Sequence, residues 1–156
     1  MSAEQTLVAL ALEREARIAV AESCTGGMIG AAITSVPGSS DVFDRGFVTY
    51  SNTAKIDMLG VADATLKQFG AVSEEVARQM ADGAMVRSGA SHVLSVTGIA
   101  GPGGSESKPE GRVCFALALS QLETETQTIE FGAIGRDAVR AAASAHAIDM
   151  LTKALQ

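Results

Sequence analysis

The sequence contains few of the residues that cross-link or stiffen small proteins. Its 156 residues include no tryptophan, one tyrosine, three prolines, two cysteines and two histidines. Cys24 and Cys114 form neither a CxxC pair nor a zinc-ligand spacing, so we expect two reduced thiols, as in a cytoplasmic protein. With so few histidines and cysteines and no aspartate-rich calcium loop, we expect no metal site.

Long apolar runs and basic runs are also missing. The longest unbroken apolar stretch covers residues 113–119, well below the ~20 residues that span a bilayer. No basic segment precedes the apolar residues 7–12, so we expect neither a membrane span nor a signal peptide. Twelve basic residues against eighteen acidic ones give a net charge of −6. The basic residues are scattered, which argues against direct contact with nucleic acid.

The residues that are present predict one α/β domain over residues 1–156. Periodicity and capping residues predict helices at 2–15, 28–34, 52–59, 65–69, 74–88 and 137–155. Strand-forming segments lie at 18–22, 42–50, 93–97, 111–119 and 126–131, and the last two form a hairpin. We therefore expect three layers, α/β/α, with a mixed sheet of about five strands.

The first candidate site is the segment 22–27, Glu-Ser-Cys-Thr-Gly-Gly, between a predicted strand and a predicted helix. Ligands of open α/β sheets bind beyond the carboxyl ends of the strands. Ser23 is placed there like an elbow nucleophile, with backbone N–H groups beside it for an oxyanion. The G-x-S-x-G pattern is absent, however. A plain helix N-cap role for Ser23 or Thr25 fits the pattern equally well.

The second candidate is Lys55, in the segment 46–55. This lysine lies at the start of a predicted helix, where the helix dipole disfavours a cation and lowers its pKa. A lowered pKa is what a lysine needs to act as a base. The spacing alone favours the plainer alternative of a solvated lysine on a surface helix. Tyr50, the only tyrosine, is open to the same plain interpretation as a packing residue.

The third candidate is the glycine-rich loop 97–105. Such a loop wraps an anion with backbone N–H groups, as phosphate nests do, or simply connects two elements. It matches neither the Walker A loop nor the dinucleotide-binding fingerprint.

Together, four segments resemble the C-terminal domain family of the competence/damage-inducible protein CinA. They are residues 21–27, 38–40, 46–55 and 97–104, the last followed by Lys-Pro-x-Gly at 108–111. The resemblance extends from about Leu7 to Leu151, with Arg112 standing where relatives often have threonine. It implies the CinA C-terminal fold and the activity of the family's stand-alone members. These hydrolyse the carboxamide of nicotinamide mononucleotide (NMN) to nicotinate mononucleotide and ammonia, without metal or cofactor, in pyridine-nucleotide salvage.

The resemblance also implies roles for individual residues. Ser23 is the expected nucleophile and Lys55 the expected base, while Ser40 and Tyr50 relay protons or orient the lysine. The residues expected to bind substrate are Thr25, Gly26, Gly27, Thr97, Gly98, Gly101, Gly103, Gly104 and Arg140. Of these, the loop 98–104 and Arg140 are expected at the phosphate. The residues alone do not separate Ser23 from Ser40 as the nucleophile.

Two other functions stay open at this point: a non-catalytic nucleotide-binding module, and a competence or DNA-damage accessory protein. The presence of both Ser23 and Lys55 counts against the first, and the acidic charge balance counts against the second. The alanine-rich faces of the predicted helices 2–15 and 137–155 exceed what one small sheet needs as cover. We therefore expect a homodimer or a higher symmetric oligomer.

Overall fold

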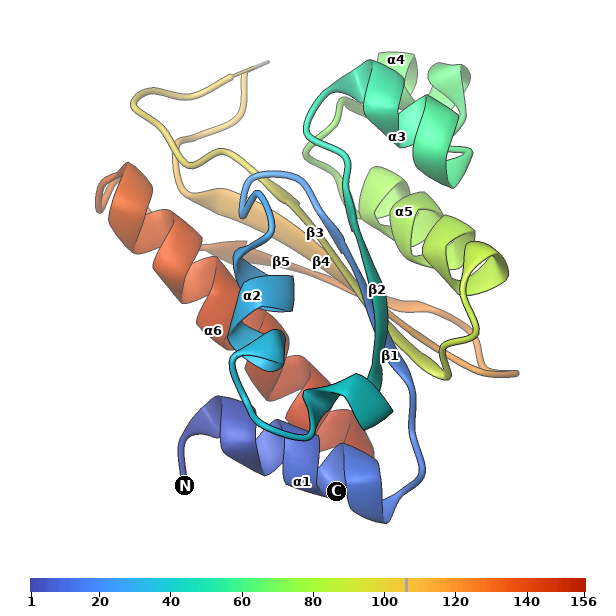
Figure 1. Cartoon of the computed structure of the whole chain (residues 1–156). Coiled ribbons are helices and arrows are strands. Elements are labelled where there is room, and N and C mark those ends of the chain that lie inside the picture. The colour runs from blue at the N-terminus through green and yellow to red at the C-terminus, as the bar shows by residue number, and fades with distance from the viewer. Residues whose placement is uncertain (106) are drawn as a thin grey trace.

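The computed structural model describes residues 1–105 and 107–156; Glu106, directly after the glycine-rich loop 97–105, lies outside the described residues. Figure 1 shows a central sheet with helices on both faces. The elements in chain order are α1 (Ala3–Glu13), β1 (Ile18–Glu22), α2 (Met28–Thr34), the 3-10 helix η1 (Ser39–Asp41), β2 (Phe43–Val48), α3 (Asn52–Leu59), α4 (Asp63–Phe69), α5 (Glu74–Arg87), β3 (His92–Gly98), β4 (Arg112–Leu119), β5 (Glu125–Glu130) and α6 (Arg136–Leu155). The predicted α/β/α architecture is confirmed.

The sheet is mixed and has five strands in the order β2-β1-β3-β4-β5. β1 pairs in parallel with both β2 and β3, and Glu22 lies opposite Val48 on one side and Val96 on the other. β4 and β5 run antiparallel and form the predicted hairpin. The carboxyl ends of β1, β2 and β3 therefore meet at one edge of the sheet, where the three candidate segments begin.

Two hydrophobic clusters lie on opposite faces of the sheet. One contains residues of α1, α2 and α6 and the larger strand side chains, such as Phe115. The other contains residues of α3, α4 and α5 against alanines of the strands: Ala19, Ala21, Ala116 and Ala118. Side chains alternate along a strand, so the small residues gather on the α5 face and allow helices to pack closely there.

The helices that motivated the oligomer prediction pack within the chain. Leu7, Val8 and Ala11 of α1 lie in one cluster with Ala143, Ala147 and Leu151 of α6. The alanine-rich faces of α1 and α6 therefore need no second copy to bury them. The homodimer stays a prediction, without this support.

Most element boundaries fall within two residues of those predicted, with one difference that matters for the site. β2 ends at Val48 and not at Tyr50. Thr49 and Tyr50 leave the sheet to form the connection into α3, so their carbonyl groups become available to side chains. The sequence patterns also gave no sign of η1.

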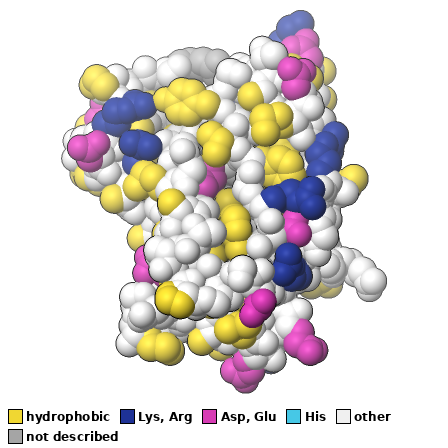
Figure 2. Space-filling view, in the orientation of Figure 1, with side chains coloured by type: hydrophobic (Ala, Val, Ile, Leu, Met, Phe, Trp, Pro, Cys, Tyr) yellow, Lys and Arg dark blue, Asp and Glu magenta, His cyan; other side chains and the backbone are white. Residues whose placement is uncertain are grey.

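The visible surface carries charges of both signs. On the face shown in Figure 2, Lys and Arg side chains lie in separate groups with acidic side chains beside them. Among the described residues, none of the helices combines the length and the apolar character that a membrane-spanning helix needs.

Gly83 sets how closely α3 approaches α5, and its substitution tests that packing. A Cβ at Gly83 would lie 1.9 Å from the carbonyl oxygen of Leu59, the last residue of α3. We expect Gly83→Ala to lower the free energy of unfolding by about 1–3 kcal/mol, because the helices must move apart. Urea unfolding monitored by circular dichroism measures this loss.

Gly30, in α2, is the matched control. A Cβ there would meet the Phe43 ring at 3.5 Å, an ordinary contact. Gly30→Ala should leave stability unchanged or raise it by up to about 1 kcal/mol, because alanine favours the helix. Equal losses in the two variants would show that the contact between α3 and α5 is not tight.

Candidate active site

The three parallel strands deliver their following residues to one cavity of about 420 Å³. Ser23 and Cys24 come directly after β1, Tyr50 follows β2, and Thr97 and Gly98 end β3. All five line the cavity, together with Asn52 and Lys55 of α3. Its volume falls within the range of ~300–1,000 Å³ that is typical of small-molecule sites.

Lys55 points inward from the first turn of α3. That helix begins at Ser51, whose hydroxyl accepts a hydrogen bond from the backbone N–H of Ala54. Lys55 is only 1% exposed, and its Nζ lies 3.0 Å from Oγ of Ser23. The structure therefore excludes a solvated surface lysine and brings the predicted base into hydrogen-bond contact with the predicted nucleophile.

Burial lowers the pKa of Lys55 from its usual 10.5 to about 8, because the charged amine loses its hydration. The neighbouring Cys24 thiolate would raise that pKa again. However, burial raises the pKa of the Cys24 thiol itself to about 11. Cys24 is therefore uncharged when Lys55 titrates and does not hold the lysine in its protonated form.

Two main-chain carbonyls orient the amine. Nζ of Lys55 donates to the carbonyl oxygen of Thr49 at 2.9 Å and to that of Tyr50 at 3.2 Å. A neutral amine has two N–H groups and one lone pair. The charged amine donates its third N–H to Oγ of Ser23. In the neutral amine both N–H groups can stay on the carbonyls, which leaves the lone pair to accept from the Ser23 hydroxyl, whose other acceptor is the carbonyl of Tyr50 at 3.4 Å. This arrangement suits proton transfer from Ser23 to Lys55.

Glu22, a residue that the sequence analysis did not single out, organises the segment after β1. Its carboxylate is 1% exposed and accepts a 2.6 Å hydrogen bond from the Thr25 hydroxyl. It also accepts from the backbone N–H of Gly27 at 3.2 Å. Thr25, Gly26 and Gly27 do not line the cavity. In this structure they shape the turn after β1, and their expected role in substrate binding stays a prediction.

Only some of the backbone N–H groups that follow Ser23 are available to an oxyanion. The N–H of Gly26 donates to the carbonyl of Ser23, and that of Gly27 donates to Glu22. Among the described residues, no carbonyl accepts from the N–H groups of Cys24 and Thr25, and the N–H of Cys24 contacts its own thiol. The donor of the residue after the nucleophile, Cys24, is therefore the best placed for an oxyanion.

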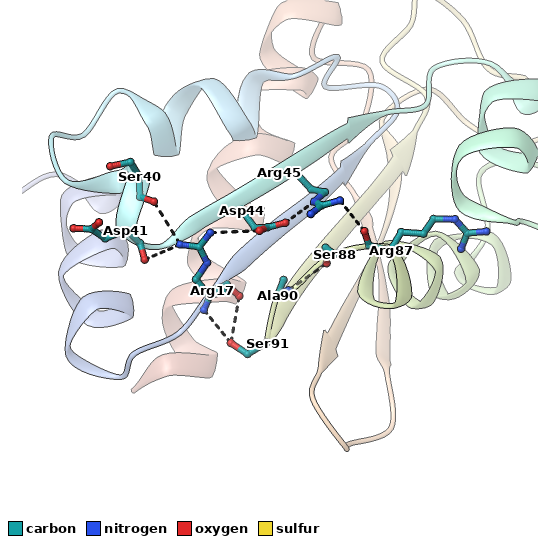
Figure 3. Close-up of polar contacts among 9 residues, drawn as sticks. All are labelled: Arg17, Ser40, Asp41, Asp44, Arg45, Arg87, Ser88, Ala90 and Ser91. Atoms are coloured by element: carbon teal, nitrogen blue, oxygen red, sulfur yellow. Dashed lines mark hydrogen bonds and ion pairs between the residues drawn. The ribbon is translucent and has the colours of Figure 1, made fainter.

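Ser40 lies at the opposite end of the sheet. It belongs to η1, ahead of β2, and its carbonyl accepts from the Arg17 guanidinium, ahead of β1 (Figure 3). The five residues of β1 separate this end from Ser23 by about 16 Å, at ~3.3 Å per residue. The structure does not bring Ser40 to Lys55, so it leaves Ser40 no direct part in nucleophilic attack or proton relay.

Tyr50 and Arg140 lie near the site, and both make contacts whose atoms the sequence did not specify. The Tyr50 hydroxyl accepts from Arg136 at 2.9 Å, so its main-chain carbonyl and not its phenol contacts Lys55. Arg140 donates through Nε to the carbonyl of Cys24 at 3.0 Å. It is not among the residues that line the cavity, and in this structure it holds the main chain of the nucleophile segment.

The glycine-rich loop forms one wall of the cavity, as expected. Its wall includes Gly98, Gly101, Gly103 and Gly104. Thr97 lines the base of this wall, but its hydroxyl donates to the carbonyl of Ala71. The N–H of Gly103 donates to Glu110, so this loop does not offer all its N–H groups to an anion.

Two cations that the sequence analysis missed lie at the cavity, Lys108 and Arg136. Arg136 donates to the carbonyl of Gly101 at 2.6 Å, and Lys108 donates to that of Val72 at 2.6 Å. Arg136 is the first residue of α6, a position that the helix dipole disfavours for a cation. A basic residue at the start of a helix was the feature that singled out Lys55 in the sequence. Arg136 has the same feature and could have been found in the same way.

The described residues contain no cluster of three or more histidine, cysteine, aspartate or glutamate side chains placed to hold a metal ion.

Comparison with known proteins places the chain in a family. The model of the CinA C-terminal domain matches residues 1–155. The protein named nicotinamide-nucleotide amidohydrolase PncC of Escherichia coli K12 is 51% identical over 139 residues, covering 88% of this chain and 84% of that protein. A CinA-like protein of Chlorobaculum tepidum is 56% identical over 116 residues, covering 74% of this chain and 27% of its own length. The chain spans 27–37% of the length of the first curated relatives it matches.

Solved structures agree. A competence/damage-inducible protein from Agrobacterium tumefaciens is 45% identical, with a TM-score of 0.91 over 99% of this chain and 96% of that one. A CinA superfamily protein from Klebsiella pneumoniae is 34% identical, with a TM-score of 0.93 over 98% and 95%. With matching motifs, fold and family model, the chain belongs to the CinA C-terminal domain family.

Proposed function

We propose that this chain is an amidohydrolase that converts NMN to nicotinate mononucleotide and ammonia through a Ser23 acyl-enzyme. The observation that carries the proposal is the buried Lys55 amine, 3.0 Å from the Ser23 hydroxyl. The substrate comes from the PncC relative, which is named for nicotinamide-nucleotide amide hydrolysis. An intact and buried pair of this kind also counts against a non-catalytic binding module.

The acylation step uses the pair as nucleophile and base. Neutral Lys55 takes the Ser23 proton while Oγ bonds to the carboxamide carbon, and the carbonyl oxygen becomes an oxyanion facing the N–H of Cys24. The tetrahedral adduct then collapses. Its C–N bond breaks, and the Lys55 ammonium returns the proton to the departing nitrogen, which leaves as ammonia.

Deacylation repeats the sequence with water. Lys55, neutral again, takes a proton from water as the oxygen bonds to the acyl carbon. Collapse of the second adduct breaks the bond to Oγ, and the lysine returns the proton to Ser23. The products balance as one carboxylic acid and one ammonia for each amide and water consumed.

The cavity has features that suit the other end of NMN. The nucleotide carries a phosphate, and Lys108 and Arg136 provide cationic groups beside the glycine-rich wall. Guanidinium groups bind phosphate through paired N–H donors. A neutral Lys55 also avoids repulsion of the positively charged pyridinium ring.

Substitutions in the pair test the mechanism. Ser23→Ala and Lys55→Ala should each lower kcat for NMN by about a thousandfold or more. Lys55→Arg should be as inactive, because arginine does not deprotonate. The double variant Ser23→Ala with Lys55→Ala should be little worse than either single one, because the two groups act as a unit. Ammonia release measures kcat, and thermal melts confirm folding.

Ser40→Ala is the matched control and should keep activity within about twofold, because Ser40 lies at the other end of the sheet. An inactive Ser40→Ala beside an active Ser23→Ala would place the nucleophile elsewhere. An active Lys55→Arg would show that Lys55 serves as a fixed cation and not as a base.

The pH dependence follows from the lowered pKa of Lys55, about 8. Only the neutral amine accepts the Ser23 proton, so activity should rise as pH increases. Below pH 8, kcat should change about tenfold per pH unit, with roughly one enzyme molecule in ten carrying a neutral lysine at pH 7. Above pH 8 it should level off. A profile that is flat between pH 6 and 9 would contradict Lys55 as the base.

A further inference from the structure

Glu22 is a buried ionisable group beside Ser23 that the proposed reaction does not use. It ends β1, directly before Ser23. Its Oε1 accepts from the Thr25 hydroxyl at 2.6 Å and from the N–H groups of Gly27 and Ile29 at 3.2 and 3.0 Å. Its Oε2 accepts from the N–H of Gly30 at 3.0 Å.

These contacts explain why a carboxylate is tolerated in the interior. The first N–H groups of a helix lack acceptors within the helix. The N-cap residue of α2 is Gly27, which has no side chain to cap the helix. Glu22 supplies the missing acceptors, and its negative charge lies at the positive end of the helix dipole. Four donors together replace the hydration that the carboxylate loses.

The same contacts close the segment between Glu22 and Gly27 into a rigid turn. On its inner side, the N–H of Ser23 donates to the carbonyl of Val96 in β3. On its outer side, Arg140 binds the carbonyl of Cys24. The N–H of Cys24 belongs to the peptide unit of the Ser23 carbonyl, which accepts from the N–H of Gly26, so this N–H points the opposite way from that carbonyl. Together with the contacts of Glu22 and Arg140, this bond fixes the direction of the peptide groups that follow Ser23.

We propose that Glu22 is a positioning residue for the nucleophile turn: it holds the Ser23 hydroxyl on Lys55 and aims the Cys24 N–H at the developing oxyanion. This inference rests on the proposed role of Ser23 as nucleophile. It assigns Glu22 no proton transfer and no contact with substrate. It also predicts no direct effect on Lys55, because the amine's own partners are Ser23 and two carbonyls.

Glu22→Gln is the informative substitution. The side chain keeps its shape, and the amide oxygen can keep the three donors now on Oε1. The amide nitrogen then faces the N–H of Gly30, and the negative charge is lost. Ser95→Ala is the matched control, because Ser95 is also fully buried and donates at 2.6 Å to a main-chain carbonyl, that of Ala77. It lies in β3, outside the cavity lining.

The readout is the rate at which a fluorophosphonate probe labels Ser23, measured between pH 6 and 10 by mass spectrometry. The phosphonyl oxygen occupies the position of the oxyanion, so the rate reports on the turn without requiring NMN. We expect Glu22→Gln to slow labelling at least tenfold at pH 9, with the same midpoint in pH as the wild type. Ser95→Ala should label within twofold of the wild type, whatever its melting temperature.

Labelling of folded Glu22→Gln within twofold of the wild type would overturn the proposal. So would a shifted midpoint, which would show that Glu22 acts through Lys55. If Glu22→Gln does not fold, Thr25→Val decides in its place, because it removes one donor and keeps the carboxylate. It should slow labelling at least threefold at an unchanged midpoint, and an unchanged rate would overturn the proposal.

The proposed substrate is tested separately. A wild-type protein that is labelled at Ser23 and does not hydrolyse NMN would refute the substrate and leave the comparison of variants valid. A wild-type protein that is not labelled at all would overturn the positioning role together with the nucleophile.

Discussion

The contact between the Lys55 amine and the Ser23 hydroxyl, closed off from water, is the constraint on which the site depends. It requires α3 to begin where β2 ends, so that a residue of its first turn reaches across to the end of β1. It also requires close packing of α3 on α5, which Gly83 allows next to Leu59. The alanines on that face of the sheet serve the same end by letting the helices approach.

Burial places two ionisable groups of opposite charge beside Ser23, and the fold keeps them apart. The carboxylate oxygens of Glu22 accept hydrogen bonds from a hydroxyl and three backbone N–H groups. The amine of Lys55 instead contacts two carbonyls and Ser23. An ion pair between them would favour the charged amine and raise the pKa of Lys55. Because the two groups have separate partners, desolvation lowers the pKa of Lys55 without opposition from the carboxylate. A lysine that acts as a base near neutral pH needs such a lowered pKa.

The sequence predicted the architecture because helix caps, glycine stops and strand-forming runs are local signals. It also placed Ser23 and the segments after β2 and β3 at strand ends, and parallel strands bring such ends together. It could not decide whether Lys55 was buried, since that depends on the docking of α3 against other elements. The prediction that Lys55 acts as a base, and is not a solvated surface lysine, therefore rested on the resemblance to the family.

The differences between the predicted and the observed positions of site residues have the same origin. Ser40 matches a family motif, but η1 sets it before β2, at the wrong end of the sheet, and no local pattern predicted η1. Thr25 and the glycines after it were assigned to substrate, because nothing in the sequence showed that Glu22 would occupy the start of α2. Lys108 reaches the cavity from a long loop, whose path local rules do not determine.

Direct titration of the Lys55 amine tests the central claim. The chain has four lysines, so NMR of protein carrying ¹³C-labelled lysine side chains gives few signals, and the one missing from Lys55→Arg belongs to Lys55. If Lys55 is the base, this signal should titrate near pH 8. A midpoint near the ordinary 10.5 would mean that the lysine stays charged at neutral pH, and would contradict its role as the base.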